Sequence, residues 1–204
     1  MDSNTLLLLF LSVFAASLPL LFYLALLVWM DRYEREPLWL VALVFLWGAV
    51  GAVILALVGS VILASPTDTL LPPILAGAVA ATIIAPVVEE PAKALVFCLL
   101  VRSRHFDNPT DGFVYGAAAG LGFGMTENFL YFASQASSTD DWVFTVIIRT
   151  LFSAPMHACA TALIGMSFGL AKFKGWRYRA LVVPIGLFLA IGLHMTWNGL
   201  LTLE

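Results

Sequence analysis

The sequence predicts an all-α fold, a polytopic membrane helix bundle with about six transmembrane helices. Of the 204 residues, 61% are hydrophobic and 11% are charged, whereas soluble domains are about 45–50% apolar and about 25% charged. The mean hydropathy is +0.97. A soluble protein of this length could not bury so much apolar surface, so lipid must surround most of the chain. The small net charge of −3, with no basic patch, argues against nucleic-acid binding.

Six apolar runs are long enough to cross a membrane, which takes about 20 residues. They cover about 5–30, 38–64, 72–101, 113–134, 142–171 and 180–203. Four prolines interrupt the third run: Pro72, Pro73, Pro86 and Pro91. They predict a kink, or a re-entrant segment before the helix proper. Because the connections are short and contain no linker or repeat, we expect one domain over 1–204, with a motif-bearing core over about 72–203.

The basic residues predict the orientation of the bundle. Eight of the ten lie in the first, third and fifth connections: Arg32, Arg35, Arg102, Arg104, Lys172, Lys174, Arg177 and Arg179. The N-terminus, the other two connections and the C-terminus contain none. By the positive-inside rule, both termini should be extracytoplasmic in this integral, multi-pass membrane protein.

Seven ionisable side chains fall inside the predicted spans: Glu89, Glu90, Lys93, Glu127, Arg149, His157 and His194. Each is costly in lipid unless it faces protein or water. With a helical rise of about 1.5 Å per residue, the carboxylates and imidazoles of four spans lie at a similar depth, outside the midplane. Structural ion pairs placed independently would not share a plane. The sequence therefore predicts one polar site.

Spacing within the third and sixth spans indicates which side chains can meet. Glu89 and Lys93 are four residues apart and can pair on one helix face, while Glu90 points about 100° away. One carboxylate can therefore stay paired and leave the other free for proton transfer. His194 and Asn198 are also four residues apart, so an imidazole and an amide share a face.

Two further patterns concern packing. Gly116, Gly120 and Gly124 precede Glu127 at intervals of four, a small-residue pattern that lets the fourth span approach a neighbour closely. Arg149 lies about 12 Å further out than His157, near the external interface. There its long side chain can reach the membrane surface, so we expect a structural or substrate-orienting role for it.

The candidate catalytic residues are Glu89, Glu90, Lys93, Glu127, His157, His194 and Asn198. They can support hydrolysis in two ways. A paired glutamate can activate a water while the histidines and Asn198 stabilise the oxyanion. Alternatively, Glu127, His157 and His194 can bind zinc, with a paired glutamate as the base. A transporter with a proton or cation relay is the rival interpretation, although no inverted repeat is visible.

Four motifs carry a family resemblance. The EEPAK segment at 89–93, the FGMTEN segment at 123–128, His157, and His194 with Asn198 resemble, in this order, the PrsW family of intramembrane proteases. The resemblance implies a protease of a prokaryotic cytoplasmic membrane. Its expected substrate is a single-span membrane protein, in some members an anti-sigma factor, cleaved on the extracytoplasmic side. Lipid is the other expected partner, and the oligomeric state stays open.

The pattern is also distantly similar to the CAAX prenyl endopeptidases and the bacteriocin-processing proteases. Those families normally carry histidine in the second motif, where this chain has Glu127, so PrsW is favoured and a CAAX-type protease is the alternative enzyme. PrsW-type enzymes are commonly classed as metallopeptidases, whereas a metal-free glutamate mechanism is argued for the CAAX relatives. The resemblance therefore leaves both mechanisms open.

Overall fold

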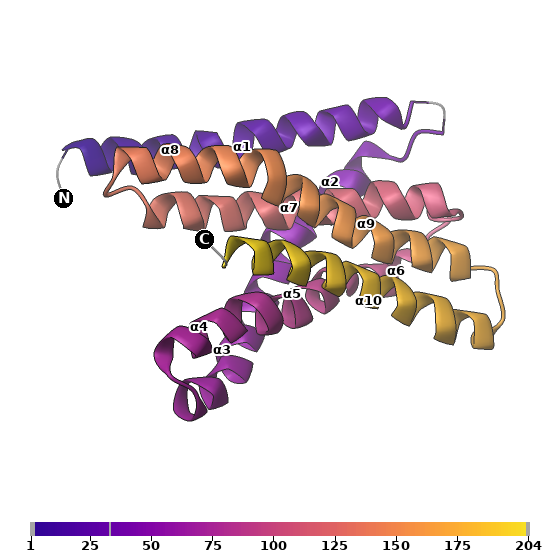
Figure 1. Cartoon of the computed structure of the whole chain (residues 1–204). Helices are drawn as coiled ribbons and strands as arrows, with labels where there is room; N and C mark the ends of the chain where they lie inside the picture. The colour runs from indigo at the N-terminus through magenta and orange to yellow at the C-terminus, as the bar shows by residue number, and fades with distance from the viewer. Residues whose placement is uncertain (1–2, 33, 203–204) are drawn as a thin grey trace.

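The computed structural model describes residues 3–32 and 34–202, and every regular element in these ranges is a helix. The all-α prediction is confirmed, and the elements form six passes that match the six apolar runs (Figure 1). They are α1 (Ser3–Met30), α2–η1–α3 (Leu38–Leu46, Trp47–Ala52, Val53–Leu70), α4–η2–α5–α6 (Pro73–Val79, Ala80–Ile84, Ala85–Ala94, Phe97–Leu100), α7 (Pro109–Ser134), α8–η3–α9 (Thr139–Ile148, Arg149–Ser153, Ala154–Ala171) and α10 (Trp176–Leu201). The three η segments are π-helical turns.

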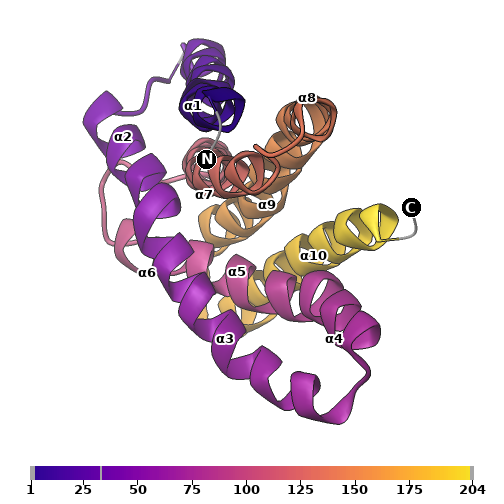
Figure 2. The ribbon, with the colours of Figure 1, turned by 90° about the vertical axis from the view of Figure 1, so that its left-hand side faces the viewer.

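Four helical stretches in the described part are long and apolar enough to cross a membrane. They are Ser3–Met30, Leu38–Thr67, Thr139–Ala171 and Trp176–Leu201. The fourth pass, α7, spans 26 residues but is rich in glycine and carries polar side chains. It lies between α1, α2 and α9 (Figure 2), so protein and not lipid covers most of its surface. A helix in this position needs small side chains more than apolar ones.

The third pass is helical from Pro73 to Ala94, and the π turn η2 interrupts its α-helical pattern just before Pro86. In η2 the N–H of Ala85 bonds the carbonyl of Ala80, five residues back. In the same π-helical pattern, the next carbonyl, that of Ala81, would accept a hydrogen bond from the N–H of residue 86. Residue 86 is a proline and has no N–H. The π turn therefore exposes one backbone acceptor just before the paired glutamates.

The fifth pass repeats this arrangement. In η3 the N–H of Ala154 bonds the carbonyl of Arg149, and Pro155 then leaves the carbonyl of Thr150 without a π-register donor. The hydroxyl of Tyr23 on α1 donates to Thr150 O at 3.4 Å. Each π–proline element directly precedes helical residues of the predicted polar site, a position where π turns are frequent in proteins.

The connections divide between the two ends of the bundle. The amide of Asn4 donates to Thr139 Oγ1 at 3.3 Å, which places the start of α1 beside the start of α8. At the opposite end, Lys172 donates to the carbonyl of Ser103 at 2.6 Å. Figure 1 shows the ends of α1, α6 and α9 on the right and the end of α10 on the left. The basic connections thus gather at one end, which the charge rule predicts to be cytoplasmic.

Helices α7 and α9 pack with their backbones in contact. A Cβ added at Gly116 would lie 2.5 Å from the carbonyl of Thr161, and Gly112 and Gly120 face α9 as closely. The predicted small-residue pattern is therefore correct for Gly116 and Gly120. It is wrong for Gly124, where the nearest backbone atom is 3.6 Å away. There the nearest atom belongs to the side chain of His157, at 3.5 Å.

Candidate active site

Helix α5 supplies two carboxylates and the ammonium group that holds them. Lys93 is fully buried, and its Nζ lies 2.7 Å from Glu90 Oε1 and 3.6 Å from Glu89 Oε2. The expected Glu89–Lys93 pair is therefore the longer of the two contacts. Residues three apart also share a helix face, and the flexible lysine side chain reaches the nearer carboxylate. The Phe123 ring lies 4.0 Å from the same Nζ and closes this side of the site.

Glu90 is fully buried and bonded on both oxygens. Its Oε1 lies 2.8 Å from His194 Nδ1 on α10, and its Oε2 accepts a 3.4 Å bond from Thr161 on α9. A carboxylate so enclosed has little room for substrate. It is placed to orient His194 and to balance the charge of Lys93.

Glu127 on α7 contacts one residue of α9 and one residue of η3, the π turn that precedes α9. Its Oε2 lies 2.6 Å from His157 Nε2 and 2.7 Å from Arg149 Nη2. Arg149 also donates from Nε to Asn128 at 3.0 Å. The expectation that Arg149 extends to the membrane surface is wrong, because its side chain is buried and turned inward. Glu127 and Asn128 on α7 accept hydrogen bonds from the guanidinium. The long arginine side chain spans the difference in depth between Arg149 and these two residues.

The two imidazoles meet in the centre of the site. Their rings are nearly perpendicular, with centroids 4.8 Å apart, and Lys93 Nζ lies 3.0 Å from His157 Nδ1. One potential ligand atom each of Glu89, His157 and His194 lies within 4.8 Å of the others. Oε2 of Glu89 is buried and has no hydrogen-bond partner in the part of the chain described. A carboxylate with a vacant acceptor beside two histidines suits a metal ion.

This grouping differs in one member from the expected zinc ligands Glu127, His157 and His194. In the group that could hold a metal ion, Glu89 stands in place of Glu127, whose Oε2 contacts Arg149 and His157. Spacing along separate helices fixes depth but not the direction of each side chain, so it could not distinguish the two carboxylates.

Two cavities reach the site from different sides. One, of about 200 Å³, lies between α5, α9 and the end of α10, where Asn198 and Thr202 contribute polar groups. The other, of about 190 Å³, lies between α3 and α7 and has mostly apolar walls. Glu89, Glu127 and Tyr131 line both. The carboxylates of Glu89 and Glu127 therefore stand where the two cavities meet.

Asn198 lines the first cavity, but its amide already has a partner. Nδ2 donates a 2.9 Å bond to the carbonyl of Ala81, the acceptor exposed by η2 and Pro86. Beside it, Trp197 Nε1 donates to Ser153 Oγ at 3.0 Å. The structure thus brings Glu89, Glu90, Lys93, Glu127, His157 and His194 together, and places Asn198 at the edge of the site as a link between α10 and the third pass.

Some contributors were not singled out from the sequence. Thr161 lies one helical turn after His157, and Tyr131 one turn after Glu127. The Tyr131 ring lies 3.7 Å from the guanidinium carbon of Arg149 and holds it from the outside. A search for polar and aromatic residues four positions from each ionisable group would have found both.

The same arrangement of motifs connects the chain to known proteins. Curated proteins named Protease PrsW are similar to it: that of Geobacillus kaustophilus is 34% identical over 149 residues, covering 70% of this chain and 59% of that protein. For Clostridioides difficile the identity is 29% over 163 residues, with 76% and 66% covered. For Bacillus subtilis it is 30% over 115 residues, with 56% and 50% covered. The chain therefore spans about half to two thirds of the length of these relatives.

No solved structure matches the chain. The model of the PrsW family of intramembrane metalloproteases matches residues 36–204, which include all four motifs and every helix from α2 onward. The chain belongs to the PrsW family of intramembrane metalloproteases.

Proposed function

We propose that the protein is an intramembrane endopeptidase that hydrolyses a peptide bond in a single-span membrane protein, with an anti-sigma-factor-like protein as the substrate. The observation that carries the proposal is the meeting of two cavities at Glu89 and Glu127, directly beside two buried histidines. Family membership favours this function over a transporter and over a CAAX-type protease.

Zinc is the metal that the donor set suits best. Two imidazoles and a carboxylate form a common catalytic zinc shell, and Glu89, His157 and His194 are the residues that would hold the ion. A bound zinc ion would supply Lewis-acid activation of a water and of the scissile carbonyl. The Oε2 of Glu89 supports this assignment, because a buried carboxylate oxygen normally accepts a hydrogen bond, whereas this oxygen has only the longer contacts of 3.6 Å to Lys93 and 3.9 Å to His194.

The remaining polar groups have separate roles. Glu127 is the base, because its side chain is 19% exposed and borders both cavities. Arg149 and His157 hold one of its oxygens, which leaves the other to accept a proton from water. Glu90 and Lys93 are positioning residues: they orient His194 and neutralise one another deep in the protein.

The metal-free mechanism assigns the same residues differently. Glu89 would activate the water directly, and His157 and His194 would donate to the developing oxyanion. The family description as metalloproteases favours the metal-dependent version. Measurement of bound metal separates the two.

The cavities suggest how substrate and water reach the site. The mostly apolar cavity between α3 and α7 suits a segment that arrives from lipid, and the polar cavity near the end of α10 suits water. A volume of about 190 Å³ holds side chains but not a helix about 10–12 Å wide. The substrate must therefore unwind locally, which also exposes its peptide bond.

The test is a cleavage assay with the full chain and a single-span reporter in liposomes. Glu89→Gln and Glu127→Gln should each lower the cleavage rate by about 100-fold or more. Glu34→Gln, in an exposed connection, is the matched control and should cleave normally. Mass spectrometry of the fragments should place the cut in the extracytoplasmic half of the reporter's span. Normal cleavage by both site variants would show that the proposed site is wrong.

A further inference from the structure

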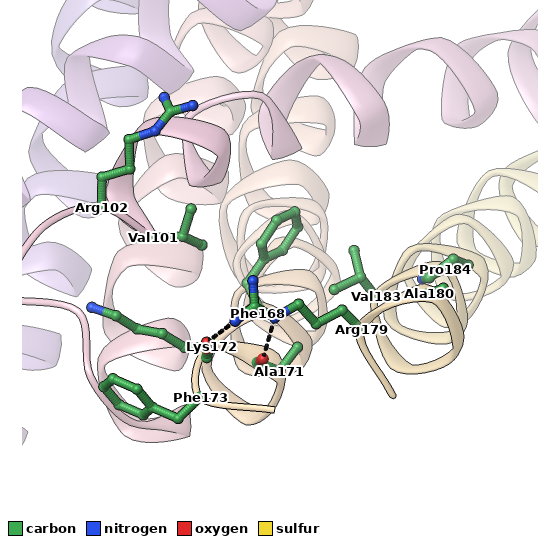
Figure 3. A pocket seen from close by; sticks show the side chains of 10 residues that line it. All are labelled: Val101, Arg102, Phe168, Ala171, Lys172, Phe173, Arg179, Ala180, Val183 and Pro184. Carbon is green, nitrogen blue, oxygen red and sulfur yellow. Dashed lines mark hydrogen bonds between the residues drawn. The ribbon is translucent and has the colours of Figure 1, made fainter. Parts of the chain in front are cut away.

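A second cavity system lies far from the proposed active site, at the end of the bundle where the basic connections meet. The cavity has a volume of about 730 Å³ and lies between the segment that follows α6, the end of α9 and the start of α10 (Figure 3). None of the residues that line it belongs to the polar site. The cavity is therefore separate from the proposed active site.

The cavity carries three positive charges and no negative one. Arg102, Lys172 and Arg179 line it, and no carboxylate in the described ranges forms an ion pair with any of them. Lys172 donates to the carbonyl of Ser103 at 2.6 Å, and Arg179 donates to that of Ala171 at 3.1 Å. Lys172 also donates to the carbonyl of Phe106, and Arg179 to those of Lys174 and Lys172, so neutral carbonyls hold these two side chains without cancelling their charge. The arrangement is therefore prepared for an anion.

The rest of the lining is apolar. Val101, Phe168, Val183 and Pro184 form the wall between the cations, and Figure 3 shows Phe168 between Arg102 and Arg179. The Phe168 ring stacks on Phe97 with centroids 5.4 Å apart, which fixes its position. The cavity thus combines a cationic rim with a hydrophobic wall.

Its location matches the boundary of the membrane. Phe173 and Trp176, between α9 and α10, are 73% and 74% exposed, as aromatic side chains often are at the level of lipid head groups. Further along α10, toward the middle of the bundle, the apolar side chains of Leu181 and Ile185 are also exposed. The positive-inside rule assigns this end to the cytoplasmic leaflet, where basic pockets between helices bind anionic lipids.

We propose that this cavity binds an anionic phospholipid. Arg102, Lys172 and Arg179 contact the phosphate, and the first part of an acyl chain lies on Phe168 and Val183. A water-soluble phosphate would leave the apolar wall without a partner, and an apolar helix would leave three cations unpaired. A lipid satisfies both halves of the cavity at once.

The test uses the full chain in a non-ionic detergent and native mass spectrometry. The probes are phosphatidylglycerol and phosphatidylcholine with identical acyl chains. Phosphatidylglycerol should bind at a concentration at least about fivefold lower. Arg102→Gln should lose about fivefold in affinity for it, and this arginine forms no ion pair within residues 3–32 and 34–202 whose loss would compromise folding. Arg177→Gln is the matched control, since Arg177 is exposed in the same basic end but does not line the cavity.

A second variant tests the apolar half. Ala180→Trp fills the cavity without removing a charge, so it should weaken phosphatidylglycerol binding while the protein stays monodisperse with an unchanged melting temperature. Glycerol phosphate serves as a competitor without acyl chains and should not displace the lipid at equal concentration. Displacement by it, equal binding of the two lipids, or equal behaviour of Arg102→Gln and Arg177→Gln would each overturn the proposal.

Discussion

The amide of Asn198 donates a 2.9 Å hydrogen bond to the carbonyl of Ala81 and thereby joins α10 to the third pass. The bond exists because Pro86 cannot supply the donor that the π turn calls for. The two helices that it connects carry His194 and the paired glutamates. The carbonyl that η2 leaves without a backbone donor thus accepts a hydrogen bond from α10, and this bond helps to position the site.

Replacing Asn198 with leucine removes this donor and leaves a carbonyl unsatisfied inside the protein. We expect a loss of about 1–3 kcal/mol in the free energy of unfolding, together with slower cleavage. Thr196→Val is the control on the same helix, because Thr196 is exposed and bonds the carbonyl of Gly192 in its own helix. Detergent-based unfolding curves measure both variants. Equal stability of the two would show that the Asn198 bond contributes nothing.

Arg149 and Glu127 should be energetically coupled. Arg149→Met leaves Glu127 with His157 as its remaining partner, so we expect destabilisation of about 1–3 kcal/mol. The double variant Arg149→Met, Glu127→Gln should lose less than the sum of the single losses, by about 1 kcal/mol. Arg177→Met controls for loss of a positive charge. Strict additivity in this cycle would contradict the inward orientation of Arg149.

Two glycines on α7 should respond oppositely to alanine. At Gly120 a Cβ would collide with the backbone of His157 and Ala158, so Gly120→Ala should cost about 1–3 kcal/mol and displace His157. At Gly124 the nearest atom is 3.5 Å away, and alanine is a better helix former than glycine. Gly124→Ala should therefore be neutral or stabilising. Unfolding curves that rank the two in the reverse order would contradict the packing of α7 on α9.

Glu36, in the connection between α1 and α2, should make stability depend on pH. Burial raises the pKa of its carboxyl from 4.5 to about 7, partly offset by the Tyr115 hydroxyl, which donates a hydrogen bond to it. Between pH 4.5 and 7 the folded state therefore binds more protons than the unfolded state, and this contribution to stability declines as the pH rises.

Glu36→Gln should remove that decline and be more stable than the wild type above pH 7, by on the order of 1 kcal/mol. Melting temperatures between pH 4.5 and 8 measure the effect. Glu34→Gln, at an exposed position in the same connection, should keep the wild-type profile. A profile for Glu36→Gln that is parallel to the wild type would refute the assignment.

Metal content should follow the histidines of the site. Elemental analysis of the purified protein should find about one zinc per chain, lost together with activity in His157→Ala and His194→Ala. His105→Ala should retain both, because His105 lies in the connection after α6, outside the site. Full cleavage after exhaustive chelation, with no metal detected, would instead support the glutamate mechanism.

The sequence alone determined the membrane class, the six passes and the existence of one polar site. These properties depend on local quantities: the length of an apolar run, the cost of an ionisable group in lipid, and the rise of a helix. The carboxylates and imidazoles that depth arguments placed in one layer are the ones that contact each other across α5, α7, α9 and α10. Local information was sufficient to predict this layer, because the depth of a residue depends only on its position along its own helix.

Only the tertiary structure decided how those groups pair. It placed Lys93 nearer Glu90 than Glu89, turned Arg149 inward to Glu127, and engaged Asn198 with a backbone carbonyl. The orientation of each side chain depends on the rotation of its helix against its neighbours. Two π turns change that rotation immediately before the site residues, and close contacts at the α7 glycines fix it. Spacing within one helix carries no information about these relations between helices.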